Sequence, residues 1–273
     1  MVINTNLPAL NASVRLGQTA AQLAQSLQRL SSGSKLASAA DDSAGQAMSM
    51  HLTSKLGRLE AALNNIGNAI SFSQTQDGYL QKANYALNRM GELSMLAMDA
   101  TKTNADRRLY QQEFHSLGVY VNEVGTKNFN GVSLFNSVNL WVTTDPEVDG
   151  RTFFNSYTKF GIDLNNTTLA AVVADDVGTA ATAVTAMQHV KAALDFLASS
   201  RADVGLGLET LAFYHDQTLS LKNNLSAANS RITDVDVAQE STNYAKFNIL
   251  TQAGTAMLAQ ANSLPQSVLK LLG

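Results

Sequence analysis

The chain contains no cysteine among its 273 residues, which excludes disulfide bridges, thiol catalysis and cysteine-based zinc sites. Aromatic residues are also scarce, at 7% of the chain, and much of the 45% hydrophobic content is alanine. Small side chains let helices pack closely, but each buries little apolar surface. Burial stabilises a fold by about 25 cal/mol per Å² of apolar surface, so each small side chain contributes little. The composition therefore predicts slender helical packing rather than a thick globular core.

The chain also has no strong positive charge and no long apolar run. Its formal net charge is −3 and its lysines and arginines are scattered, which argues against binding to nucleic acid. No run of about 18 apolar residues occurs, so we expect no membrane span. Residues 1–6 show no basic stretch followed by an apolar core, so we expect export, if any, without a cleaved signal peptide.

Motifs for catalysis are missing as well. The four histidines are far apart and no His-Glu-x-x-His occurs, whereas a metal site needs clustered ligands. Aspartate pairs at 41–42, 175–176 and 234/236 lie at breaks in the helical pattern, which favours helix caps over acid–base chemistry. The segment 205–207 has two glycines of a dinucleotide loop but neither the third glycine nor a preceding strand. We therefore predict that the chain is not an enzyme and has no cofactor.

What the chain does have is helical stripes near both ends, where apolar residues recur in alternating steps of three and four. The first stripe is Leu16, Ala20, Leu23, Leu27 and Leu30, and the second is Leu211, Tyr214, Thr218, Leu221, Leu225, Ala228 and Ile232. Such steps keep side chains on one narrow seam that a lone helix cannot bury. The seams predict pairing between the two ends of the chain, or with copies of it.

The remaining pattern predicts helices, a small β insert and more helices. We expect helices at about 9–30, from a start signal at 41–43 to about 100, at 106–124, at 179–231 with a defect at Gly205 and Gly207, and at 237–262, with Pro265 just beyond the last. From about 132 to 177 the chain gains β-branched and aromatic residues. Within it, 139–144, 145–150 and 151–154 read as strand, turn and strand.

Several motifs then resemble those of the bacterial flagellin family. At the N-terminal end they are Arg29-Leu30-Ser31-Ser32-Gly33, Ala40-Asp41-Asp42-Ser43-Ala44-Gly45-Gln46-Ala47-Met48, the segments 71–78 and 87–93, and Phe129-Asn130-Gly131. At the C-terminal end they are the segments 225–232 and 252–255 and the run from Leu258 to Leu269, which is the most specific. The resemblance covers about 1–135 and 185–273.

The resemblance implies a mainly α fold: a long antiparallel bundle or coiled coil formed by the N- and C-terminal regions, with a small β-hairpin insert. Residues 1–41 and 235–273 would form a terminal, tube-lining coiled-coil domain. Residues 42–234 would form a helical rod that includes the insert at about 132–178. The large outer domains of longer flagellins look absent.

The same resemblance implies a structural subunit that polymerises into the extracellular flagellar filament for motility. The expected assembly seam is Leu16, Leu23, Leu27, Leu30, Leu221, Leu225, Ile232 and Leu258. Implied partners are other copies of the chain, an export chaperone, the filament cap and the hook-junction proteins. The terminal helices, rich in Ala, Ser, Gln and Asn, should be disordered in free subunits and ordered on assembly.

Two other functions fit the pattern less closely. A hook–filament junction protein shares the N-terminal motifs, but the ending from Ala261 to Leu269 favours flagellin. A flagellin-like adhesin or glycan-binding protein of the cell surface would use the β insert, since little else is free of packing duties.

The resemblance also implies recognition by the flagellin-sensing Toll-like receptor through Arg89, Leu93 and Glu113. Arg89 and Leu93 are four residues apart and so share a helix face, and Glu113 would lie on the antiparallel neighbour. An intersubunit contact is the alternative role for the same residues.

Overall fold

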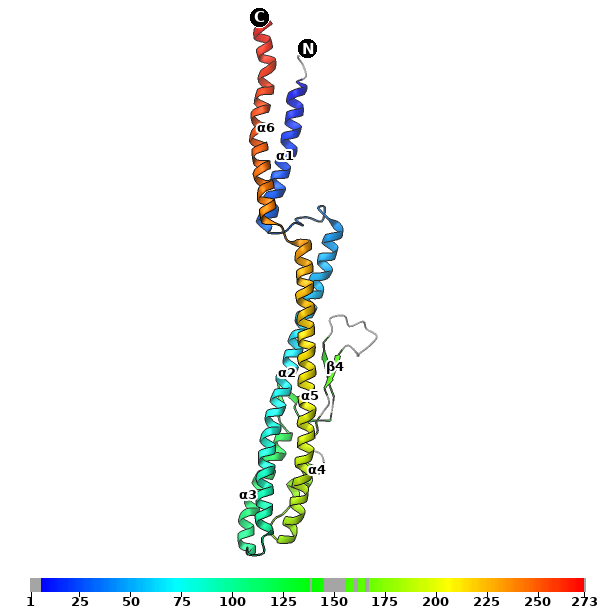
Figure 1. The fold of residues 1–273 in the computed structure, drawn as a ribbon, viewed down its shortest axis with the longest axis vertical. Helices are drawn as coiled ribbons and strands as arrows, with labels where there is room; N and C mark the ends of the chain where they lie inside the picture. Colours follow the sequence, from blue (N-terminus) through cyan, green and yellow to red (C-terminus); the bar gives the residue numbers. More distant parts are fainter. Residues whose placement is uncertain (1–5, 138, 145–155, 160–161, 165–166, 273) are drawn as a thin grey trace. The chain divides into compact units, whose positions relative to one another are not determined.

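The computed structural model describes residues 6–137, 139–144, 156–159, 162–164 and 167–272 (Figure 1). The chain divides into two compact units. One combines Met1–Leu56 with Asn223–Gly273, and the other is Gly57–Lys222. We call them the terminal unit and the central unit. The mainly helical architecture with a small strand hairpin confirms the expected fold class.

In the terminal unit the first helix lies along the last one. Helix α1 spans Leu7–Ser32 and α6 spans Val237–Leu272, and the two run side by side in opposite directions (Figure 1). Asn6 caps α1 by accepting a hydrogen bond from the Ala9 amide at 3.1 Å, and Pro8 occupies the first turn, where it loses no helical bond. Gly33 ends α1 with a φ of 69°, the left-handed conformation that glycine adopts most easily.

The predicted end of the last helix before Pro265 is wrong, because α6 continues through this residue to Leu272. A proline removes the N–H that would bond the carbonyl four residues earlier, which here is that of Ala261. The side-chain amide of Asn6 donates to this carbonyl at 2.9 Å. The neighbouring end of α1 therefore supplies the hydrogen bond that Pro265 cannot, and one cost of continuing the helix is removed.

The links between helices in the terminal unit are built on aspartates. The Asp41 carboxylate accepts hydrogen bonds from the amides of Ala37 and Ser38 and from the side chain of Gln25, which lies on α1. These bonds, led by that from Ser38, lower the pKa of Asp41 below its usual value. The predicted capping roles are confirmed nearby: Asp42 accepts from the Gly45 amide at the start of α2, and Asp236 accepts from two amides at the start of α6.

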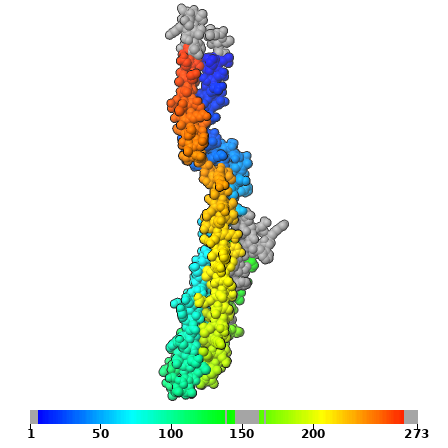
Figure 2. Space-filling model, viewed as in Figure 1, coloured from blue at the N-terminus to red at the C-terminus, as the bar shows by residue number. Residues whose placement is uncertain are grey.

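Three helices carry most of the central unit. Helix α2 spans Ser43–Met98, α3 spans Asn104–Gly125 and α5 spans Ala180–Thr233, so the expected bounds are close to those observed. In Figure 2 the yellow surface of α5 lies alongside the cyan and green surface of α2 and α3. Helix α5 shows no break at Gly205 or Gly207, and the predicted defect is wrong. Gly207 is buried in the bundle, where close packing offsets the weak helix preference of glycine.

The core of the central unit gathers apolar residues of α2, α3, α5 and the segment between α3 and α5. Its largest fully buried members include Leu80, Leu87, Met90, Leu93, Phe114, Phe135, Leu169 and Leu197. Between α2 and α3, Thr103 and Asp106 form a capping box, each side chain bonding the other residue's amide. Beside the core, Arg201 of α5 donates to the partly exposed Asp77 of α2 at 2.8 Å.

Two antiparallel strand pairs lie beside these helices. Strands β1 (Asn128–Phe129) and β2 (Val132–Ser133) are joined by Asn130 and Gly131, whose φ angles of 50° and 82° suit a tight hairpin turn. Strand β3 (Leu140–Thr143) matches the expected first strand of the insert and pairs with β4 (Ser156–Lys159). The expected second strand at 151–154 lies outside the described residues.

The insert also contains a short helix that the sequence pattern does not predict. Helix α4 spans Thr167–Ala174, in a segment rich in β-branched residues, and its Leu169 and Val172 are buried. It packs against α3, where the Cα of Val173 would lie 3.6 Å from a Cβ added at Gly118. Tertiary packing thus overrides the local preference for strand.

Arg107 fastens the turn between α2 and α3. Its guanidinium is buried and donates to the carbonyls of Ala97 and Asp99, at 2.7 and 2.9 Å, and to the side chain of Asn104. We predict that Arg107→Met lowers the free energy of unfolding by about 2–3 kcal/mol, because two carbonyls lose a charged donor. Urea unfolding of the variant measures this loss. Arg108→Met, one residue along on the exposed face, is the matched control, and an equal effect of both substitutions would contradict the assignment.

Candidate functional site

The paired helices α1 and α6 leave a wide apolar surface uncovered. The contact between them is made by small or partly buried side chains: Gly254 lies so close to Leu16 that an added Cβ would be 3.1 Å from the leucine Cδ1. Large apolar side chains elsewhere on the two helices are exposed instead. These are Leu7, Leu10, Val14 and Leu27 on α1 and Val237, Ile249, Leu250 and Met257 on α6, each at least 45% exposed. A surface of this kind marks an interaction site.

The residues of the expected seam fall into two groups. Leu16, Leu23 and Leu30 of α1, Leu225 and Ile232 of α5 and Leu258 of α6 are half-buried within the single chain. Leu27 is 54% exposed and Leu221, which belongs to the central unit, is 38% exposed. The stripe on α1 is therefore divided: most of it packs within the chain, and Leu27 stays exposed.

The exposed residues of α6 were not in the sequence-based seam. Ile249, Leu250 and Met257 lie in the C-terminal helix, and Ile249 and Met257 are each 65% exposed. A stripe with steps of three and four marks only the residues that one helix turns toward one neighbour. It misses a second apolar face, whose signal was the simple abundance of large side chains on both sides of the last helix.

A second candidate surface lies on the central unit, where Arg89 of α2 meets Glu113 of α3. The Nε of Arg89 donates to Glu113 Oε1 at 2.7 Å, and its Nη1 donates to Glu92 Oε2 at 2.8 Å. The hydrogen bond from Arg89 lowers the pKa of Glu113, and the same contact raises the pKa of Arg89. All three side chains are about half exposed, and the pair lies on antiparallel neighbours as expected.

Leu93 is placed differently from Arg89 and Glu113. It is only 1% exposed and belongs to the hydrophobic core of the central unit. The four-residue spacing does put Arg89 and Leu93 on adjoining parts of α2, but the leucine turns inward. The charged pair is on the surface, whereas the leucine is part of the buried core.

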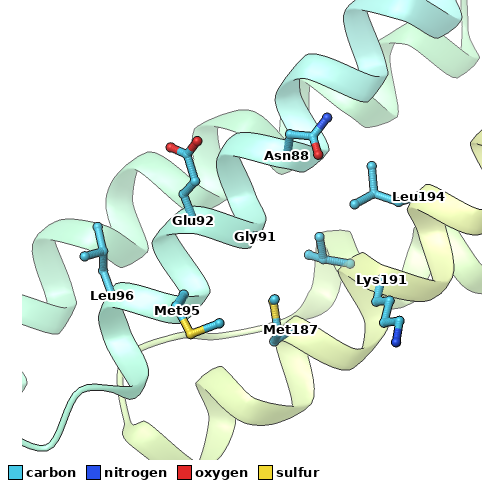
Figure 3. Close-up of a pocket in the computed structure, with 9 residues that line it drawn as sticks. Asn88, Gly91, Glu92, Met95, Leu96, Met187, Lys191 and Leu194 are labelled. Carbon is cyan, nitrogen blue, oxygen red and sulfur yellow. The ribbon is translucent and has the colours of Figure 1, made fainter.

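A groove beside this surface separates α2 from α5 (Figure 3). Its walls are mainly apolar, with Met95 and Leu96 on α2 and Met187 and Leu194 on α5. Gly91 forms part of the α2 wall, where an added Cβ would lie 3.5 Å from Val190 Cγ1. Small and flexible side chains thus leave an open hollow of about 640 Å³ between the two helices.

The polar residues considered for chemistry have structural partners. Asp175 accepts from His189 Nδ1 at 2.9 Å, and Asp176 accepts from the Gly178 amide ahead of α5. Asp234 accepts from the hydroxyls of Ser230 and Thr233, which lowers its pKa. Over the ranges that the structure describes, no three acidic or histidine side chains gather as metal ligands would. No described helix has the length and apolar character needed to cross a membrane.

Comparison with known proteins places these features in a family. Residues 3–140 match the bacterial flagellin N-terminal helical region, and residues 187–272 match the bacterial flagellin C-terminal helical region. The flagellin of Halalkalibacterium halodurans is 33% identical over the full length of both chains, and flagellin FlaB1 of Treponema pallidum is 31% identical, also over the full length of both.

A solved structure shows the same fold at low identity. A putative flagellar hook-associated protein from Vibrio parahaemolyticus aligns with a TM-score of 0.58 and 13% identity, covering 71% of this chain and 100% of that one. Because the two family matches together span most of the sequence and full-length relatives exceed 30% identity, the chain belongs to the bacterial flagellin family and is a structural subunit of the flagellar filament.

Proposed function

We propose that the chain is a non-catalytic subunit that polymerises into an extracellular flagellar filament through α1 and α6. The observation that carries this proposal is the apolar surface of the terminal unit, which no described part of the same unit covers. Neighbouring copies could cover this surface through contacts between two different faces of the subunit. A set of copies joined in this way need not close into a ring. Such contacts build an open helical filament.

The terminal helices gain little stability when a single chain folds alone. Within one chain α1 has only Ala9 and Ser26 buried, although it is 26 residues long. Ordering a residue costs about 1–2 kcal/mol in backbone entropy, which such sparse burial does not repay. Neighbouring copies supply the missing burial, so folding of the ends and assembly are expected to occur together.

Family membership supports several finer roles as part of the same proposal. We propose that the subunit leaves the cell without a cleaved signal peptide and meets an export chaperone, the hook-junction proteins and the filament cap on its way. The pair Arg89–Glu113 is our candidate contact for the flagellin-sensing Toll-like receptor, since both side chains are exposed. Leu93 would act there by holding α2 in place.

The proposal predicts that a chain without residues 1–40 and 237–273 stays a soluble helical monomer. Most of the core of the central unit is retained in that chain, whereas both helices that carry the exposed apolar face are gone. Circular dichroism checks the helical content, and electron microscopy after seeding with full-length filaments checks assembly. Filaments grown from the shortened chain would contradict the proposal.

A further inference from the structure

The central unit contains a second hollow, between α2 and the strands of the insert. It has a volume of about 480 Å³, within the range of about 300–1,000 Å³ that is usual for small-ligand sites. Helix α2 forms one wall, and the β1–β2 turn and strand β3 form the other. We call it the strand hollow. Its lining includes Asn65, Asn68, Phe72, Phe129, Asn130 and Trp141.

The sequence places the wall residues of α2 on one stripe. Asn65, Asn68 and Phe72 are spaced by three and four residues, so they share one side of the helix. Phe72 is 7% exposed, and its ring meets that of Phe129 edge to face, with centroids 5.8 Å apart. Aromatic pairs of this geometry are stable, which gives the hollow a firm apolar floor.

Three amide side chains surround this apolar floor. Asn65 and Asn68 come from α2, and Asn130 comes from the β1–β2 turn, and all three are exposed. In the part of the chain that the structure describes, none of these three side chains has a hydrogen-bond partner. Each amide offers two donors and one acceptor. The hollow thus provides unused amide groups from both of its walls.

Strand β3 adds a large aromatic surface to the rim. Trp141 is 60% exposed and is the single tryptophan of the chain. Its neighbours Leu140 and Val142 are half-buried, which follows the alternation of a strand. No Lys, Arg, Asp, Glu or His lines the hollow, so it offers no charge to attract an anion or a cation.

We propose that the strand hollow binds a neutral saccharide, a role separate from polymerisation. A pyranose ring has an apolar face of C–H groups and an edge of hydroxyls. The C–H face suits the indole of Trp141 and the phenyl rings of the floor. The hydroxyls suit amides, which both donate and accept. A charged ligand is disfavoured because no charge on the lining would replace its lost hydration.

The test is titration of the full-length monomer with neutral sugars. Isothermal calorimetry and tryptophan fluorescence are the two readouts. The panel contains glucose, galactose and N-acetylglucosamine, with the dimer and trimer of the last. We expect saturable heat and a change in Trp141 emission with at least one of them. If affinity rises from N-acetylglucosamine to its trimer, the natural ligand is part of a glycan polymer. If affinity does not rise, the natural ligand is a free sugar.

Variants separate this site from unspecific binding. Asn68→Ala should weaken binding about fivefold, the effect of one lost hydrogen bond. Trp141→Ala should weaken it more than tenfold, and Trp141→Phe should restore part of the loss. Asn64→Ala is the matched control on the same helix, since Asn64 is exposed but does not line the hollow, and should leave the affinity unchanged.

Three outcomes would overturn the proposal. The first is the absence of saturable heat with every sugar of the panel. The second is an equal loss in Asn68→Ala and Asn64→Ala. The third is tighter binding of glucuronate or glucosamine than of the neutral sugars, which would make charge the basis of recognition. If the first outcome comes with a change in Trp141 emission on polymerisation, the hollow is covered by a neighbouring copy instead.

Discussion

Leu27→Asp is expected to abolish seeded filament growth and to leave the helical content of the monomer unchanged. Leu27 is 54% exposed in the single chain, so a carboxylate at this position remains in water before assembly. In a filament the same position would be covered by a neighbour. A buried charge without a partner costs several kcal/mol, and the cost recurs in every subunit. Light scattering after addition of wild-type seeds measures the growth rate.

The matched control for this substitution is Leu27→Met, which keeps the volume and the apolar character. It should grow filaments at close to the wild-type rate, because similar-sized apolar side chains exchange at little cost. Seeded filament growth of the Leu27→Asp variant at the wild-type rate would mean that Leu27 lies outside the interface between copies.

Leu93→Ala should lower the free energy of unfolding of the chain by about 2–5 kcal/mol, the usual cost of removing a leucine from a packed core. Leu93 is 1% exposed, so the surrounding helices cannot close the cavity without moving. Chemical denaturation followed by circular dichroism measures the change. Leu96→Ala, on the same helix and 42% exposed, should cost less than about 1 kcal/mol and serves as the control. Equal stability of the Leu93→Ala variant and the wild type would contradict its place in the core.

The stability of the Leu93→Ala variant also bears on the recognition surface. Arg89 and Glu113 are exposed and joined by hydrogen bonds, whereas Leu93, four residues from Arg89 on α2, is buried. A loss of receptor response in Leu93→Ala would therefore report on a displaced α2 as much as on a lost contact. Only the charged pair can be tested as direct contacts.

Much of the fold could be predicted because local signals and packing agree. The aspartates at 42 and 236 cap the helices that they precede, and Thr103 and Asp106 close a capping box at the start of α3. The step of three and four residues along α2 continues through Asp77 and Gly78 without a break. These features depend on residues close together in the chain, which is why the sequence reveals them.

The parts that could not be predicted depend on residues far apart in the chain. Where helix α6 passes Pro265, Asn6, 255 positions from Ala261, donates to the carbonyl that the proline leaves unpaired. Helix α4 forms because α3 offers it an apolar surface, against the preference of its own β-branched residues. Neither partner can be recognised from the local pattern.

The assembly site divides in the same way. The stripe containing Leu16, Leu23 and Leu30 marks a face that needs covering, and the structure covers part of it with α6. The exposure of Leu27 and Met257 becomes visible only once α1 and α6 are paired. A single-chain pattern cannot separate the face that packs within the chain from the face left for a neighbour.

The most direct test of the account is hydrogen exchange of the backbone amides of α1 and α6, measured in free monomers and in filaments. If these helices fold fully only when neighbouring copies cover them, their amides should exchange quickly in the monomer and at least about 100-fold more slowly in the filament. Amides in the core of the central unit should be protected in both states. Equal protection of α1 and α6 in monomer and filament would contradict the claim that assembly of the terminal helices builds the filament.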